Sequence, residues 1–579
     1  MKAESTMPDP QYPRQFVDPA DDLGTWDQIE PYYRKLLNRD LGSVAELEAW
    51  LIDASELMAC IDEVRTDRYV RMTCQTDDPQ REKAYLDFVE NIEPQWKQMC
   101  QLVDVKYTEC PAAGELPRPR YHVFDRDVRS QVELFREENV KLQTEESKLE
   151  QQFQKLCGAM TVHYEGKEQT LQQLAVYGER TDRNQRQETW ELATQRRLAD
   201  VEALEDIFDE LFKLRHRMAQ NADLPDYRAY AFKAKQRFDY RPQDCLDFHD
   251  AIEGAVVPVM RAMHERRASA LKLDTLRPWD LAVDEQGRPP LKPCETIDEL
   301  CAKCSRAFHR VDTELGDRFD AMNTGGCLDL DSRKGKAPGG YQATYAESRR
   351  PFIFMNAVGL QRDVRTLIHE GGHAFHAYES RHDPLFHYRS APIEFAEVAS
   401  MGMEMLAYDF FDEFYEGSDL IRAKRAQLEG IVNLLPWVAT IDAFQHWMYT
   451  HPDHTREARQ DTWLSLHARF GGLEDYSGHE KALAYSWQRQ LHLFEVPFYY
   501  VEYGIAQLGA LQVWQNARRD RKKTVADYRK ALALGGGRPL PELFAAAGAR
   551  FDFTLDTLSP LMEAVAEELA SLDGCASGA

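Results

Sequence analysis

Basic residues are outnumbered by acidic ones in this sequence. Lys and Arg number 71 against 97 Asp and Glu, a formal net charge of −26 over 579 residues. A surface that binds nucleic acid needs clustered basic side chains, and so does docking on an anionic membrane. We therefore expect a soluble protein that binds neither nucleic acid nor membrane.

Long apolar runs and a disulfide framework are missing as well. The most apolar stretch, 431–443, is interrupted by Asn433, Pro436 and Asp442, so no segment is expected to span a membrane. The eleven cysteines are odd in number and scattered, unlike a disulfide framework. The first residues, MKAESTMPDPQYPRQF, contain no apolar core of a secretory signal. These features predict a cytoplasmic protein.

Apolar residues recur at helical spacing along most of the chain. Residues 128–157 are predicted to form one long charged helix and residues 182–221 a second, while 160–167 carry a short hairpin signal. The run 351–356 is β-like, and almost everything after Asp363 has a helical pattern. The sequence therefore predicts a mainly α protein with a small β-sheet near the middle of the chain.

The strongest chemical signal is the segment His369-Glu370-Gly371-Gly372-His373. Two histidines four apart on a helix lie on one face, so both imidazoles can reach one Zn²⁺ ion. Glu370 can accept a proton from a water that the metal has made acidic. The alternative is a pair of exposed histidines with no ligand role. We predict His369 and His373 as metal ligands and Glu370 as general base.

The surroundings of this motif are typical of a helix, for which Asp363 is the predicted N-cap. Gly371 and Gly372 fit less easily, because each costs about 1 kcal/mol relative to Ala in a helix interior. Their presence predicts a close contact, either with a neighbouring helix or with bound peptide. We favour the neighbouring helix.

A catalytic zinc needs a third protein ligand. The segment 391–401 is typical of a helix start and carries Glu394 and Glu397 one turn apart, with Glu404 two turns further on. Acidic side chains are costly to bury on an apolar helix unless they are paired or bind metal. Glu397 is the predicted third ligand. Glu394 or Glu404 is expected to hold a ligand histidine, although plain solvent exposure fits Glu394 better than Glu397.

Two further features are not assigned a catalytic role. Cys301 and Cys304, with Cys294 nearby, lie in a helical pattern without a second Cys pair, so we do not predict a metal or redox site there. His376 lies three residues after His373, where support of a ligand or packing is more common than ligation.

Three blocks of the sequence resemble the oligoendopeptidase F and thimet oligopeptidase family of zincins. They are the histidine motif followed by Glu397-Val-Ala-Ser400, the segments 336–341 and 351–356, and the segment 492–504. The resemblance runs from about residue 190 to the end. We therefore expect an N-terminal helical region, 1–190, and a catalytic region, 191–579, with interleaving of the two left open.

This resemblance implies a two-lobed helical clam with a deep channel and a small sheet beside the zinc helix. It implies a zinc-dependent endopeptidase that cuts internal bonds of short unfolded peptides, with Glu397 as the third zinc ligand. It also implies that Phe352–Asn356 forms an edge strand able to pair with substrate backbone.

The C-terminal block carries hydrogen-bond donors. His492, Tyr499, Tyr500 and Tyr503 can stabilise the oxyanion that forms when water attacks a peptide carbonyl. Helical spacing places Tyr503 beside Tyr499 at i,i+4 or beside Tyr500 at i,i+3. We favour His492, Tyr499 and Tyr503 as catalytic residues, with core packing as the alternative for each tyrosine.

Two other functions remain open. Related helical zincins act as carboxypeptidases or dipeptidyl carboxypeptidases, which need a positive group for the substrate carboxylate, and the sequence does not identify one. A peptide-binding protein without activity is the third possibility. It is disfavoured because Glu370 and all three predicted ligands are present.

Overall fold

The computed structural model describes residues 11–577, and side chains up to Asp573. The expectation about a secretory signal rests partly on residues 1–10, which lie outside this range. The chain divides into two units, each assembled from three segments. Unit 1 comprises 1–133, 292–423 and 509–551, and unit 2 comprises 134–291, 424–508 and 552–579. The boundary expected at residue 190 stays a prediction.

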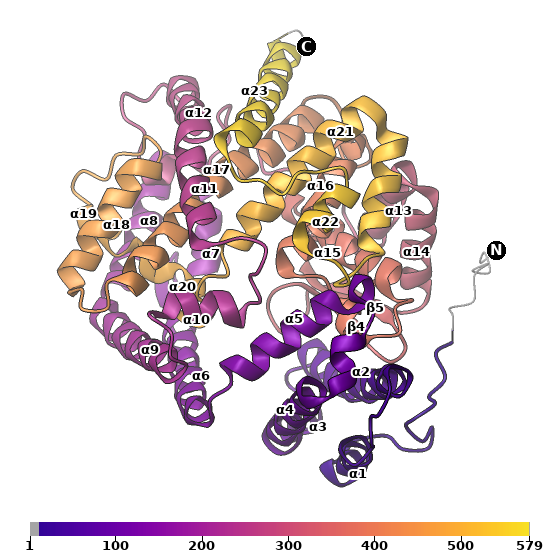
Figure 1. Ribbon diagram of the computed structural model, residues 1–579. Coiled ribbons are helices and arrows are strands. Elements are labelled where there is room, and N and C mark those ends of the chain that lie inside the picture. The colour runs from indigo at the N-terminus through magenta and orange to yellow at the C-terminus, as the bar shows by residue number, and fades with distance from the viewer. Residues whose placement is uncertain (1–10, 578–579) are drawn as a thin grey trace. The chain divides into compact units, whose positions relative to one another are not determined.

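The described chain is built mainly of helices (Figure 1). Unit 1 also contains one sheet of three strands. Its elements are α1 (Trp26–Leu37), α2 (Val44–Cys74), α3 (Pro79–Asp87), α4 (Glu93–Glu109), α5 (Arg118–Leu134), α13 (Ile297–Val311), α14 (Thr313–Thr324), β3 (Leu328–Asp331), β4 (Tyr341–Tyr345), β5 (Arg350–Ala357), α15 (Gln361–Ser380), α16 (Ile393–Ala407) and α22 (Leu540–Ala546).

Unit 2 is helical apart from one hairpin. Its elements are α6 (Glu137–Gly158), β1 (Thr161–Tyr164), β2 (Lys167–Thr170), α7 (Leu171–Ala175), α8 (Arg183–Leu198), α9 (Val201–Asn221), α10 (Tyr227–Ala234), α11 (Pro242–Ala255), α12 (Val257–Ala270), α18 (Arg456–Phe470), α19 (Glu480–Ala484), α20 (Leu491–Glu495) and α23 (Leu555–Ser577). Helices α17 (Gly417–Thr450) and α21 (Val501–Leu532) contribute residues to both units.

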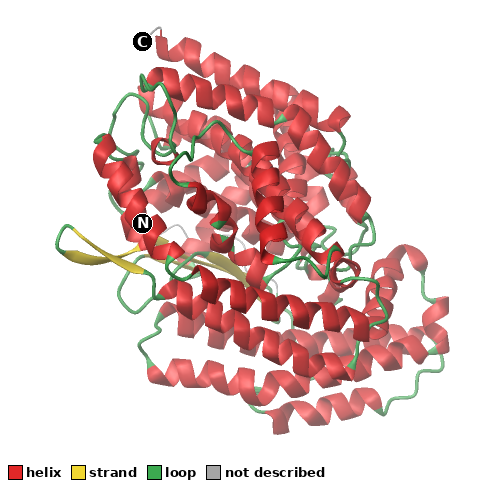
Figure 2. Cartoon of the chain, turned by 90° about the vertical axis from the view of Figure 1, so that its left-hand side faces the viewer, coloured by secondary structure: helices red, strands yellow, loops and turns green. Residues whose placement is uncertain are grey.

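The predicted mainly α class is confirmed, because strands form only a small part of the described chain (Figure 2). None of its helices is long and apolar enough to cross a membrane. The predicted hairpin is also present. Glu165 and Gly166 have φ of 51° and 73°, the two left-handed residues that the tight turn between β1 and β2 requires.

Two long helices predicted from the sequence are each interrupted. The helix expected over 128–157 is α5 followed by α6, with Arg136 extended between them at φ −137° and ψ 129°. The helix expected over 182–221 is α8 followed by α9, separated by Asp200 at ψ 10°. Neither break carries Gly or Pro. Arg136 is held by a hydrogen bond to the Asn221 carbonyl, a tertiary contact that the local pattern does not reveal.

The sheet of unit 1 has the order β3-β5-β4, with β3 parallel and β4 antiparallel to β5. The expectation that Phe352–Asn356 is an edge strand is therefore wrong, since β5 is the central strand. Its run of buried apolar residues is typical of a strand covered on both faces. The edge beside β5 is β4, which pairs Gln342 with Ile353.

Helix α15 begins at Gln361, with Leu360 as its N-cap, so the prediction of Asp363 as N-cap is wrong. Asp363 caps the helix from its first turn instead. Its Oδ2 accepts hydrogen bonds from the backbone N–H groups of Val358 and Leu360, at 2.8 and 2.9 Å. A carboxylate in the first turn also interacts favourably with the helix dipole.

The preference for helix packing at the two glycines is confirmed. A Cβ on Gly372 would lie 2.5 Å from the Ala399 carbonyl oxygen and 2.6 Å from the Ser400 Cα, both on α16. A Cβ on Gly371 would lie 2.7 Å from the Phe308 ring on α13. Only residues without side chains let α15 approach its neighbours this closely.

We expect Gly372→Ala to destabilise the protein. Alanine favours a helix interior by about 1 kcal/mol over glycine. Overpacking against rigid backbone costs about 1–3 kcal/mol or more, so the clash wins. Thermal unfolding followed by circular dichroism should show a lower midpoint. Gly158→Ala, at the end of α6 with open space around it, is the matched control and should not lower the midpoint. Equal midpoints for the two variants would contradict the close approach.

Candidate metal centre

His369 and His373 lie on one face of α15, with ring centroids 5.0 Å apart and ring planes at 84°. Glu397 comes from α16, and its Oε2 lies 3.4 Å from His369 Nε2 and 3.8 Å from His373 Nε2. One ligand atom from each residue lies within 4.8 Å of the other two. The close packing of α15 on α16 therefore brings the three predicted ligands together.

This group fits a zinc ion. Tetrahedral ligands at about 2.0–2.1 Å from zinc lie about 3.4 Å from one another, close to the separations found here. Two imidazole nitrogens and one carboxylate oxygen form the donor set that catalytic zinc sites use with a fourth position open. The histidine side chains keep 24% and 20% of their surface exposed, so a substrate can reach the position between them.

Two further residues of α16 orient the ligands. Glu404 Oε1 lies 2.8 Å from His369 Nδ1, so this ring can donate to Glu404 while its Nε2 faces Glu397. Ser400 donates a hydrogen bond to Glu397 Oε2 at 3.0 Å. Of the two residues expected to support a ligand histidine, Glu404 is the one beside His369. The preference for solvent exposure of Glu394 is wrong, because this side chain is buried.

The buried carboxylates of Glu397 and Glu404 favour a positive charge beside them. Burial favours a neutral His369, but the adjacent Glu397 and Glu404 outweigh it and raise the pKa of His369 to about 10. Burial and the charge on His369 lower the pKa of His373 to about 4. Burial opposes ionisation of Glu397, yet the two histidines hold the pKa of this carboxyl below its usual value. A bound cation would stabilise these carboxylates in the same way as the proton on His369.

Glu370 lies beside the metal ligands without belonging to them. Burial raises the pKa of its carboxyl to about 7, against the opposing charge of His369. A backbone hydrogen bond from Gln342 also acts on Glu370. Gln342 belongs to β4, so the edge strand of the sheet lies next to this carboxylate. A carboxyl with a pKa near 7 can both accept and release a proton near neutral pH.

His376 is buried and packs beside the Phe395 ring, with centroids 6.3 Å apart. Burial lowers the pKa of this imidazole to about 3. It is not part of the group formed by His369, His373 and Glu397. Cys294, Cys301 and Cys304 are buried free thiols and do not belong to this group either.

His492 and three tyrosines form a second cluster, which belongs to unit 2. The His492 ring lies 5.9, 4.7 and 6.1 Å from those of Tyr499, Tyr500 and Tyr503. Burial and the nearby charge of Lys235 lower the pKa of His492 to about 4, so its ring is neutral at neutral pH. Tyr503 lies beside both other tyrosines, with ring centroids 5.4 Å from Tyr499 and 5.6 Å from Tyr500. Helix α21 begins only at Val501, so Tyr499 and Tyr500 precede the helix.

Phe498 sets the direction of this turn. It has a left-handed φ of 62°, which is strained for a bulky residue, yet it is fully buried. Gln445 accepts its backbone N–H at 2.5 Å, and Arg237 donates to its carbonyl. These contacts hold the turn that carries Tyr499 and Tyr500.

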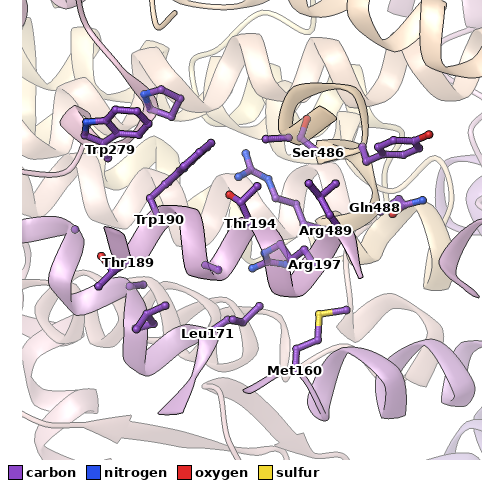
Figure 3. A pocket seen from close by; sticks show the side chains of 18 of the residues that line it. Met160, Leu171, Thr189, Trp190, Thr194, Arg197, Trp279, Ser486, Gln488 and Arg489 are labelled. Carbon is purple, nitrogen blue, oxygen red and sulfur yellow. The ribbon is translucent and has the colours of Figure 1, made fainter. Parts of the chain in front are cut away.

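A cavity of about 320 Å³ in unit 2 contains none of the predicted site residues (Figure 3). Its apolar walls include Trp190, Trp279 and Leu171, and Arg197 and Arg489 also line it. The metal centre is therefore identified from its donor atoms, because this cavity contains none of them.

A helix with His-Glu-x-x-His and a carboxylate from a following helix is the donor arrangement of a metal-dependent peptidase. The chain belongs to Peptidase family M3, whose family model matches residues 176–562. This is a family of metallopeptidases, and the resemblance found in the sequence is confirmed.

Individual relatives agree with this assignment. The chain is 24% identical over 305 residues to the oligoendopeptidase F homolog of Borreliella burgdorferi. The matched region covers 50% of this chain and 49% of that protein. The chain thus spans about half the length of the curated relatives it matches.

Two solved structures are similar over nearly the whole chain. One is assigned to oligoendopeptidase F, with a TM-score of 0.87, 27% identity and coverage of 95% of this chain and 97% of that chain. The other is PZ peptidase A with an inhibitor, with a TM-score of 0.86, 25% identity and coverage of 94% and 97%.

Proposed function

We propose that this chain is a zinc-dependent endopeptidase that hydrolyses internal bonds of short unfolded peptides. The observation that carries the proposal is the meeting of His369, His373 and Glu397 beside a buried Glu370. Family membership and the likeness to oligoendopeptidase F support it.

His369, His373 and Glu397 would hold the zinc ion. When bound, zinc supplies Lewis-acid chemistry, polarising the peptide carbonyl and making water acidic enough to react near neutral pH. Glu370 takes a proton from the attacking water as the new carbon–oxygen bond forms. It then donates that proton to the leaving amine as the carbon–nitrogen bond breaks, so the carboxylate is regenerated.

The substrate backbone is proposed to pair with β4, because this is the sheet edge next to Glu370. His492, Tyr499 and Tyr503 are proposed to donate hydrogen bonds to the carbonyl oxygen of the bond under attack. The neutral state of His492 supports a donor role that does not depend on protonation. The free cysteines of the described chain support a cytoplasmic location for this activity.

We expect Glu370→Gln to lower kcat/KM by about 10²–10⁴-fold, because a general base contributes about that much. The substrate is an internally quenched peptide blocked at both ends, and zinc content is measured on the same samples. Wild type should cut the blocked peptide, and the variant should keep its zinc. Glu379→Gln, on the same helix and paired with Arg318 and Arg529, should remain active.

Other outcomes of this experiment point to other functions. Trimming of free C-termini without cutting of blocked peptides would replace endopeptidase action by carboxypeptidase action. A wild type that binds peptide but cuts neither kind would leave a peptide-binding protein. Full activity of Glu370→Gln would remove Glu370 from the mechanism.

We expect Glu404→Gln to weaken zinc binding by about 10–100-fold, because it removes the carboxylate that orients His369. Competition with a chromophoric chelator measures the affinity. Glu379→Gln again serves as control, since it loses ion pairs on α15 away from the ligands. An unchanged affinity in Glu404→Gln would show that Glu404 does not support the ligand.

A further inference from the structure

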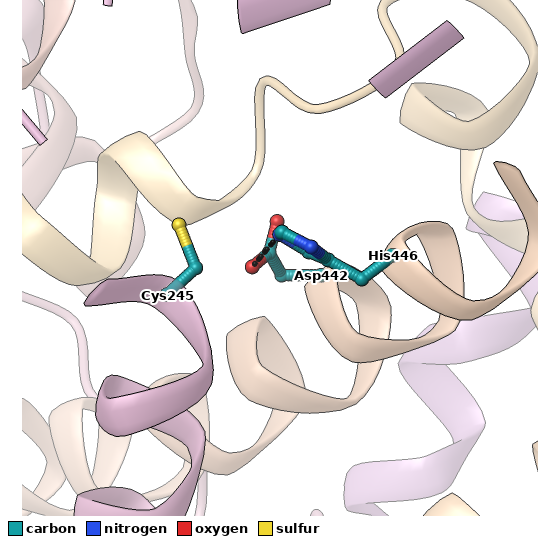
Figure 4. Close-up of side chains that lie close together, drawn as sticks. All are labelled: Cys245, Asp442 and His446. Atoms are coloured by element: carbon teal, nitrogen blue, oxygen red, sulfur yellow. Dashed lines mark ion pairs between the residues drawn. The ribbon is translucent and has the colours of Figure 1, made fainter. Parts of the chain in front are cut away.

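A second group of metal donors lies inside unit 2. Cys245 comes from α11, and Asp442 and His446 lie one turn apart on α17 (Figure 4). One ligand atom from each residue lies within 4.8 Å of the other two. All three side chains are buried, with exposed fractions of 1%, 0% and 4%. The group thus combines sulfur, oxygen and nitrogen donors in the protein interior.

Two of these atoms lack a protein partner. Within residues 11–577, Asp442 Oδ1 and both ring nitrogens of His446 make no hydrogen bond. His446 Nε2 lies 3.3 Å from Asp442 Oδ2, an ion pair when the ring is protonated, so Asp442 Oδ1 and His446 Nδ1 are the atoms left without a partner. A buried polar atom left without a partner costs about 1–3 kcal/mol. Two such atoms, Asp442 Oδ1 and His446 Nδ1, at one place indicate that something else binds there.

We propose that Cys245, Asp442 and His446 bind a second metal ion of the zinc class. The separation of 3.3 Å between His446 Nε2 and Asp442 Oδ2 is close to the 3.4 Å between His369 Nε2 and Glu397 Oε2. Both are separations expected of two atoms on one zinc ion. A thiolate and a carboxylate also balance the two charges of the ion within the buried site.

The donor types limit the choice of ion. Thiolate and imidazole favour zinc and similar transition metals, whereas magnesium and calcium prefer oxygen ligands alone. His249 stands behind the site, with Nε2 2.9 Å from Asp442 Oδ2, and can orient that carboxylate as Glu404 orients His369. Three protein ligands leave the fourth position for a water molecule.

The position of the ion indicates a structural role. The His446 ring packs against Phe498 with centroids 5.4 Å apart, and Gln445 accepts the Phe498 N–H. The ion would join α11 to the part of α17 that supports the turn carrying Tyr499 and Tyr500. This site is separate from the ligands on α15 and α16, and its existence does not depend on the proposed peptidase activity.

Metal content tests the proposal. Wild type purified without chelator and supplied with Zn²⁺ should hold about two ions per chain, the stoichiometry of two sites. Cys245→Ser and His373→Gln should each hold about one, and the combined variant about none. Cys301→Ser, which removes a buried thiol outside the group, should still hold about two. A wild type with one ion, lost in His373→Gln and kept in Cys245→Ser, would overturn the proposal.

Cobalt substitution gives a test that does not depend on the folding of any variant. The ligands on α15 and α16 include no sulfur, so a thiolate-to-cobalt charge-transfer band can arise only at a cysteine ligand. Wild type loaded with Co²⁺ should show this near-ultraviolet band, and Cys301→Ser should retain it. A cobalt-loaded wild type without the band would show that Cys245 does not bind the ion and would refute the site. Loss of the band in Cys245→Ser alone assigns it.

Discussion

The close approach of α15 and α16 is the constraint on which the candidate centre depends. Gly372 lets the backbone of α15 reach the Ala399–Ser400 backbone, where any side chain would clash. Across this contact Glu397 faces His369 and His373, Glu404 supports His369, and Ser400 supports Glu397. A separation larger by one methyl group would pull the carboxylate away from both imidazoles. The two glycines lower the intrinsic stability of this part of α15. The geometry of the metal donors requires them, because only glycine allows the close approach to α16.

The two groups of candidate metal donors share one electrostatic arrangement. A buried carboxylate, Glu397 or Asp442, faces an imidazole nitrogen at 3.3–3.4 Å and is steadied by another side chain. Carboxylates in a poorly hydrated interior are unfavourable without a positive partner. A proton on a histidine can supply that charge, and so can a metal ion. The first centre is partly exposed, which suits a catalytic use, whereas the proposed second centre is buried, which suits a structural use.

The sequence revealed most clearly those parts of the candidate site whose residues are close together along the chain. Helical periodicity alone places His369, Glu370 and His373 together. Glu397 lies on another helix and was predicted from the cost of burying an acid on an apolar helix and from the family resemblance. Cys245 was missed because its proximity to Asp442 arises from the packing of α11 on α17, nearly two hundred residues apart in sequence. The sign of this group in the sequence was Asp442-x-x-x-His446, two polar residues one helical turn apart in an apolar stretch. The breaks at Arg136 and Asp200 and the central place of β5 were likewise set by tertiary contacts that periodicity does not encode.

The interleaving of the two units has a consequence for synthesis of the protein. Unit 1 includes residues up to 551 and unit 2 resumes at 552, so neither unit can be completed before the segments around these residues have been made. Helix α11, for example, packs on α23, which is made much later. Proteins of this kind expose aggregation-prone surface during translation. Loss of the last segments would therefore leave two unfinished cores, where a protein with consecutive domains would keep one intact.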